Sequence, residues 1–127
     1  MKIVIADDSA LLRARIKELI EDYPELECIG EAQNGNDAIQ VIRDSNPDLV
    51  LLDIRMPGLS GIEVLKLIKS EGLSTKVCVL THYPYKQYKD RCLAEGADYF
   101  FDKNNDIQKI IELLAGFGSE NGGATHD

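Results

Sequence analysis

A short run of apolar residues that ends on a carboxylate constrains the fold of this chain more than any other feature. Residues 49–52 read Leu-Val-Leu-Leu, and Asp53 follows them directly. A run of this length without a polar face predicts a strand covered on both sides, as in a parallel sheet between two layers of helices. Asp53 then stands at the carboxyl end of that strand, where open α/β sheets bind their ligands. A turn-capping role would explain one such Asp equally well, so its neighbours decide.

Three other predicted strands also end on polar side chains. They span residues 2–6, 77–80 and 99–101, and each is followed by a charged residue or a threonine within two positions. Because the carboxyl ends of parallel strands meet at one edge of a sheet, these side chains are expected to converge. The candidate site residues at that edge are Asp7, Asp8, Asp53, Thr81 and Lys103.

Helical stripes of apolar residues alternate with these strands. The clearest stripe is Ile107, Ile110, Ile111 and Leu114, whereas the helix expected from Tyr85 to Leu93 has few apolar residues to hold it on the core. The expected helices begin after Ser9, near Asp37, after Ser60, near Tyr85 with Pro84 in the first turn, and near Ile107.

This alternation predicts the fold class. A fifth strand is expected over residues 27–32, where two acids and a glycine suit the edge of a sheet. Five strand-then-helix units give an α/β fold, a doubly wound five-stranded parallel sheet with five helices. A chain of 127 residues, 44% of them hydrophobic, buries one core, so we expect one domain over residues 1–116. Residues 117–127 are rich in Gly, Ser, Asn and Thr and are expected to form a flexible tail.

Charge and composition argue against several functions. A net charge of −8 and a pI near 4.7 disfavour direct nucleic-acid binding and docking on anionic lipid. No apolar run is long enough for membrane insertion, and the run over residues 1–6 is too short for a signal peptide, so a cytoplasmic location is expected. Cys28, Cys78 and Cys92 lack CxxC spacing, which indicates buried or half-buried thiols and neither a disulfide framework nor a zinc site.

The clustered acids indicate a cation site. Two unit charges about 4 Å apart repel by roughly 4 kcal/mol at an effective dielectric constant near 20, so three carboxylates together hold protons or a cation. Mg²⁺ accepts carboxylate oxygens and leaves room for a phosphoryl group. Thr81 and Lys103 could hold phosphoryl oxygens, and Asp53 is placed as a nucleophile, since carboxylates can form aspartyl phosphates.

With these residues in this order, the chain resembles the receiver domain of bacterial two-component response regulators, in particular stand-alone, chemotaxis-regulator-like members. The resemblance rests on Asp7-Asp8, Asp53, Thr81 and Lys103, together with Met56-Pro57-Gly58 just after Asp53, and it covers about residues 2–114. It implies a flavodoxin-like sheet with strand order 2-1-3-4-5. It also implies a signalling switch and no enzyme, beyond Mg²⁺-dependent self-phosphorylation and autodephosphorylation.

The resemblance also implies roles for single residues. Asp53 would take phosphate from a sensor histidine kinase, a phosphotransfer protein or a small phosphodonor. Asp7, Asp8, Asp53 and the backbone carbonyl of Arg55 would hold Mg²⁺. Phosphorylation would change the partner-binding surface made by the fourth helix, the fifth strand and the fifth helix. The switch residues would be Thr81 and Phe100, with Tyr99 as the neighbouring candidate and a plain core aromatic as the alternative reading of Phe100.

The chain departs from the family pattern at two positions. His82 stands where a small residue is usual, and Asn104 stands where a proline usually follows the lysine. We interpret His82 as a partial lid over the phosphoryl group, with water orientation or a solvent-facing side chain as alternatives. Asn104 argues against a cis peptide at that bond, since a non-proline cis bond costs about 2.5–4 kcal/mol.

Two other functions compete with this interpretation. A haloacid-dehalogenase-like phosphatase also has a nucleophilic Asp after an apolar strand, but it requires a second acid two residues later, where this chain has Arg55. A pseudo-receiver that binds partners without phosphorylation is disfavoured, because the acids, Thr81 and Lys103 are all present.

Overall fold

The computed structural model describes residues 1–82, 85–104 and 107–122, and in them strands and helices alternate as predicted. The strands are β1 (Lys2–Ala6), β2 (Glu27–Ala32), β3 (Leu49–Leu52), β4 (Lys76–Thr81) and β5 (Tyr99–Asp102). The helices are α1 (Ala10–Glu21), α2 (Gly35–Ser45), α3 (Gly61–Ser70), α4 (Lys86–Ala94) and α5 (Ile107–Gly122).

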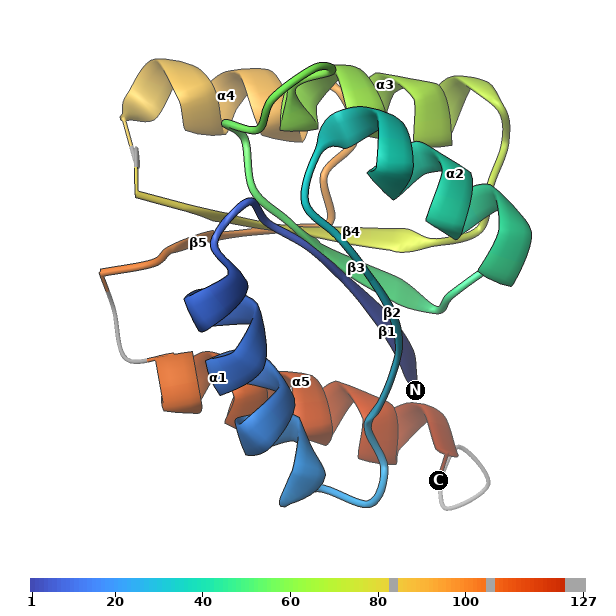
Figure 1. Ribbon diagram of the computed structural model, residues 1–127, viewed down its shortest axis with the longest axis vertical. Helices are drawn as coiled ribbons and strands as arrows, with labels where there is room; N and C mark the ends of the chain where they lie inside the picture. The colour runs from blue at the N-terminus through green and yellow to red at the C-terminus, as the bar shows by residue number, and fades with distance from the viewer. Residues whose placement is uncertain (83–84, 105–106, 123–127) are drawn as a thin grey trace.

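All five strands pair in parallel in the order β2-β1-β3-β4-β5, which confirms the predicted doubly wound sheet. Helices α1 and α5 cover one face, and α2, α3 and α4 cover the other (Figure 1). Each face has its own apolar core, and the residues of β3 alternate between the two. Leu49–Leu52 are at most 1% exposed, as expected for a central strand.

Two helices are longer than the sequence pattern predicted. Helix α2 begins two residues before Asp37, because the Asn34 side chain accepts a hydrogen bond from the Asp37 amide and caps the helix. Helix α5 continues to Gly122, so residues 117–122, the first part of the expected flexible tail, are helical. Phe117 stacks on Tyr99 of β5 with 5.0 Å between ring centroids, which anchors the added turns. Residues 123–127 and the predicted place of Pro84 lie outside the described residues.

Helix α4 is held weakly, as its sequence predicted. Cys92 is its only buried residue, and Tyr85 at its start supplies no side-chain cap. Leu93 is 44% exposed. The cysteines also match expectation, since all three are free thiols and only Cys28 is half-buried. None of the helices in the described ranges is long and apolar enough to cross a lipid bilayer.

Helix α3 is pinned to the end of β3 at Gly61. The Gly61 amide donates to the Ile54 carbonyl oxygen at 2.7 Å, and Ser60 and Glu63 form a capping box around this helix start. A β-carbon on Gly61 would lie 2.0 Å from the carbonyl oxygen of Asp53. Only glycine therefore allows the helix to approach the strand end this closely.

We predict that Gly61→Ala lowers the free energy of unfolding by about 1–3 kcal/mol, because backbone atoms must shift to admit the methyl group. Gly116→Ala is the matched control, since nothing lies within 4 Å of its β-carbon position in helix α5. That variant should be neutral or gain up to about 1 kcal/mol from helix propensity. Urea unfolding followed by circular dichroism measures both, and equal stabilities would contradict the steric argument.

Candidate functional site

The sheet brings the polar strand ends together as the sequence predicted. Leu52 of β3 is in register with Ala6 of β1 and Val79 of β4. The Asp53 amide continues this pairing by donating to the Ala6 carbonyl oxygen at 3.0 Å. On the other side, the Lys103 amide donates to the Thr81 carbonyl oxygen at 2.7 Å. The ends of β1, β3, β4 and β5 thus form one continuous rim.

The Lys103 ammonium group lies between two carboxylates at this rim. Its Nζ atom is 2.5 Å from Asp7 Oδ2 and 3.1 Å from Asp53 Oδ2. All three side chains are less than 10% exposed, and Thr81 is fully buried beside them on β4. The ammonium group offsets the repulsion between the two acids, and without it they would be buried charges lacking compensation.

The acids form a group that fits a hard cation. One carboxylate oxygen from each of Asp7, Asp8 and Asp53 lies within 4.8 Å of the others, and Asp8 is exposed to solvent. Asp7 Oδ1 accepts a hydrogen bond from the Ser9 amide at 2.9 Å. Asp53 Oδ1 is 3.4 Å from the Arg55 amide nitrogen, which places the Arg55 backbone beside the same acids. Oxygen ligands with one side open to water suit Mg²⁺.

Burial dominates the electrostatics of Asp53. The low-polarity surroundings raise the pKa of Asp53 above its ordinary value, the attraction of Lys103 opposes this rise, and the nearby Asp7 carboxylate adds to it. Ionised Asp53 is therefore incompletely stabilised by the protein itself. A cation at the rim would supply the missing partner.

The two aromatic candidates on β5 face opposite sides of the sheet. Phe100 is half-buried against the core under α2, α3 and α4. Tyr99 packs into the core under α1 and α5, where its ring stacks on Phe117. Phe100 therefore shares the side of the weakly held helix α4, and its switching role stays a prediction.

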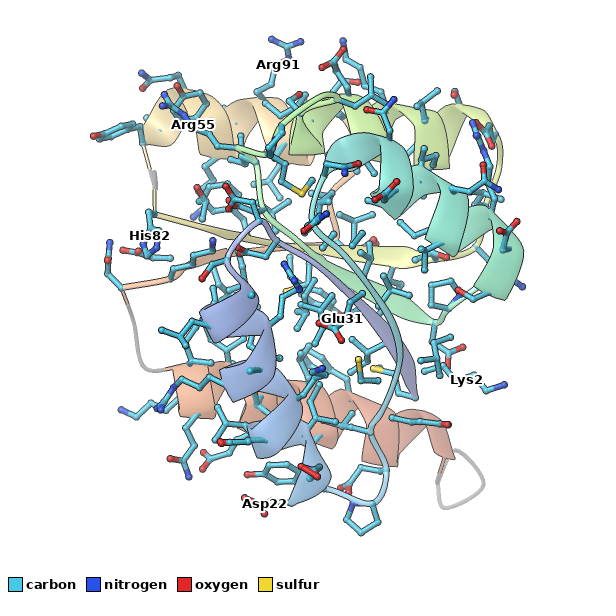
Figure 2. All side chains as sticks on the ribbon, in the orientation of Figure 1. Lys2, Asp22, Glu31, Arg55, His82 and Arg91 are labelled. Carbon is cyan, nitrogen blue, oxygen red and sulfur yellow. The ribbon has the colours of Figure 1, made fainter. Side chains whose placement is uncertain are left out.

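The two departures from the family pattern are both exposed. His82 follows the end of β4 and lies on the surface beside the rim (Figure 2). A lid role for His82 remains a prediction. The Asn104 amide donates to Asp102 Oδ1 at 2.8 Å, and no peptide bond among the described residues is cis.

Sequence reasoning missed one residue of this site, Arg13. Its guanidinium group donates to the Asp7 carbonyl oxygen and, at 3.0 Å, to Glu31 Oε1. Helical periodicity carried a signal for it, because Arg13 precedes the buried Ile16 by three residues and the buried Ile20 by seven. A charged residue on the inward face of a helix requires a partner.

Comparison with known proteins agrees with this geometry. Residues 3–115 match the model of the response regulator receiver domain. A putative transcriptional regulator of Pseudomonas aeruginosa is 38% identical over 120 residues, covering 91% of this chain and 58% of that protein. The nitrate/nitrite response regulator NarL of Escherichia coli is 32% identical over 112 residues, covering 88% of this chain and 52% of that protein. The chain thus spans somewhat more than half the length of these relatives.

Solved structures give the same result. A LuxR-family DNA-binding response regulator from Staphylococcus aureus superposes with a TM-score of 0.85 at 31% identity, covering 92% of this chain and 98% of that one. The receiver domain of the putative response regulator NarL from Mycobacterium tuberculosis superposes with a TM-score of 0.86 at 27% identity, covering 93% of this chain and 95% of that one.

The fold and the acidic rim define a signalling domain, and the matches define its family: the chain belongs to the receiver domains of two-component response regulators. It is a phospho-accepting switch of that class, and neither alternative function finds support among the matches.

We predict that Asp53→Asn raises the urea midpoint at pH 7 in metal-free buffer. An acid whose folded-state pKa is raised stabilises the fold only while protonated, and that contribution is lost as pH rises through the folded-state pKa. The advantage of the variant should therefore shrink as the pH falls toward about 4, the ordinary range for Asp.

Asp44→Asn, on the exposed surface of α2, is the matched control and should leave the midpoint unchanged. Saturating MgCl₂ should reduce or reverse the difference between wild type and Asp53→Asn. A lower midpoint for Asp53→Asn in metal-free buffer at pH 7 would show that pairing with Lys103 outweighs burial.

Proposed function

We propose that Asp53 is the residue that accepts the phosphoryl group, from a sensor histidine kinase, a phosphotransfer protein or a small phosphodonor. The observation that supports this most is the placement of a buried carboxylate between Lys103 and the acids Asp7 and Asp8. An Asp53 oxygen would attack phosphorus as the bond from phosphorus to the donor breaks, and the donor would leave with the electron pair of that bond.

The other site residues have supporting roles in this proposal. Asp7, Asp8, Asp53 and the backbone carbonyl of Arg55 would hold Mg²⁺, which supplies positive charge to the phosphoryl oxygens. Lys103 would turn its ammonium group from Asp53 to a phosphoryl oxygen, and the Thr81 hydroxyl would bind another. The protein's own chemistry would be limited to self-phosphorylation and autodephosphorylation, so its output is a change of surface.

The surface that changes is proposed to be that of α4, β5 and α5, with Thr81 and Phe100 as the switch residues. Arg55 connects the rim to this surface, because its Nη2 atom donates to the Tyr88 hydroxyl of α4 at 3.4 Å. Arg55 lies beside helix α4 in Figure 2. Since α4 has a single buried residue, a small change at the rim can shift it.

We further propose a cytoplasmic location and a downstream protein partner for the α4-β5-α5 surface. The net charge of −8 favours a protein partner over direct contact of this domain with nucleic acid or lipid. The Pseudomonas aeruginosa relative, named as a putative transcriptional regulator, extends well beyond the matched region. DNA binding is stated for the Staphylococcus aureus response regulator.

We predict that acetyl phosphate with Mg²⁺ adds one phosphoryl group to the protein and that EDTA prevents the reaction. Asp53→Ala should abolish labelling because the attacking oxygen is absent. Intact-mass spectrometry measures the product. Asp44→Ala is the control that should label like wild type, and undiminished labelling of Asp53→Ala would contradict the assignment.

We predict that beryllofluoride, a non-covalent phosphoryl mimic, changes amide hydrogen exchange in α4, β5 and α5. The weak anchoring of α4 is the physical reason. Helix α2 serves as an internal control, because several of its side chains are fully packed in the core. Changes confined to α1 and α2 would contradict this choice of surface.

A further inference from the structure

Arg13 joins three elements beneath the acidic rim. It lies in the first turn of α1, and its side chain is only 13% exposed. Its Nη1 atom donates to the carbonyl oxygen of Asp7, and its Nε atom donates to Glu31 Oε1 at 3.0 Å. Glu31, near the end of β2, also accepts a hydrogen bond from Lys17 Nζ at 2.6 Å. Its side chain lies on the side of β2 that faces α1 (Figure 2).

The peptide unit of Asp7 is therefore held from several sides. Its amide donates to the Ala32 carbonyl oxygen at 3.0 Å, while its own carbonyl oxygen accepts from Arg13. Its side chain accepts from the Ser9 amide at 2.9 Å. Of these contacts, the one with Arg13 is made by a side chain and can be removed by substitution without changing an acid of the rim.

We propose that Arg13 is a positioning residue for the divalent-cation site. By holding the Asp7 carbonyl oxygen, it fixes the turn that carries the consecutive carboxylates of Asp7 and Asp8, and Glu31 fixes the guanidinium group in turn. This inference rests on the proposed Mg²⁺ site. Groups that hydrogen-bond directly to metal ligands typically contribute 10- to 100-fold to metal affinity, and for Arg13, which acts through the backbone of Asp7, we expect the lower end of that range.

The sign of the effect separates positioning from simple charge. A guanidinium group near a cation site repels the cation, so removing it as a mere charge would strengthen Mg²⁺ binding. If Arg13 positions the metal ligands, its removal would weaken Mg²⁺ binding even though the repulsion between the guanidinium group and the cation is also removed. A structural role elsewhere in the fold would change stability and leave the affinity unchanged.

The experiment is a titration of MgCl₂ into metal-free protein, followed by ¹H–¹⁵N NMR shifts of the rim amides. Arg13→Gln should bind Mg²⁺ about tenfold more weakly than wild type. Arg13→Lys keeps the positive charge but lacks the planar guanidinium group that reaches both the Asp7 carbonyl oxygen and Glu31 Oε1. Its Mg²⁺ affinity should therefore lie between those of wild type and Arg13→Gln. Lys17→Gln is the matched control, since it removes a positive charge that pairs with Glu31 but makes no contact with Asp7. This variant should bind Mg²⁺ as well as wild type or better.

Each outcome decides the matter. Equal or tighter binding by Arg13→Gln would overturn the positioning role, and so would equal weakening by Lys17→Gln. If circular dichroism shows that Arg13→Gln is unfolded, Arg13→Lys decides, and wild-type affinity in that variant would overturn the proposal. If the wild-type protein does not bind Mg²⁺, the metal site itself is refuted along with this inference. If the wild-type protein binds Mg²⁺ and the Arg13 variants bind it equally well, only the role of Arg13 is refuted.

Discussion

The ion-pair group of Lys103 with Asp7 and Asp53 is the interaction on which the rest of the site depends. Two carboxylates almost excluded from water would repel each other strongly, and the Lys103 ammonium group compensates them both. The compensation is incomplete, because the pKa of Asp53 still lies above its ordinary value. An added cation would relieve this imbalance, and it would also offset the further negative charge that a phosphoryl group brings to the rim.

The fold gives this charged rim a rigid base and one compliant neighbour. Strands β1 and β3 are almost fully buried, and α3 is fixed to the end of β3 through Gly61, so Asp53 has little freedom to move. Helix α4 has one buried residue, and the Arg55–Tyr88 hydrogen bond connects it to the loop after Asp53. A change of charge at the rim is therefore expected to move α4 rather than the strands.

Strand β5 connects the rim with both cores because its side chains alternate between the faces of the sheet. Phe100 contacts the core on the side of α4, and Tyr99 stacks on Phe117 of α5 on the opposite side. Lys103, which closes the rim, follows this strand directly. Movement of Lys103 toward a phosphoryl group would thus act on an element that contacts α4 and α5 together.

The sequence by itself determined the strand–helix order, the edge position of β2 and the convergence of Asp7, Asp8, Asp53, Thr81 and Lys103. These follow from local patterns, because a buried strand must be apolar and parallel strands end at a common edge. The tertiary structure decided the role of Arg13, the extension of α5, and which of the two cores Tyr99 and Phe100 each enter. Arg13 contacts Glu31, and Tyr99 contacts Phe117, only after packing brings separate elements together. The helix propensity of a Gly- and Ser-rich segment is too weak to predict α5 beyond Gly116 without the contact between Phe117 and Tyr99.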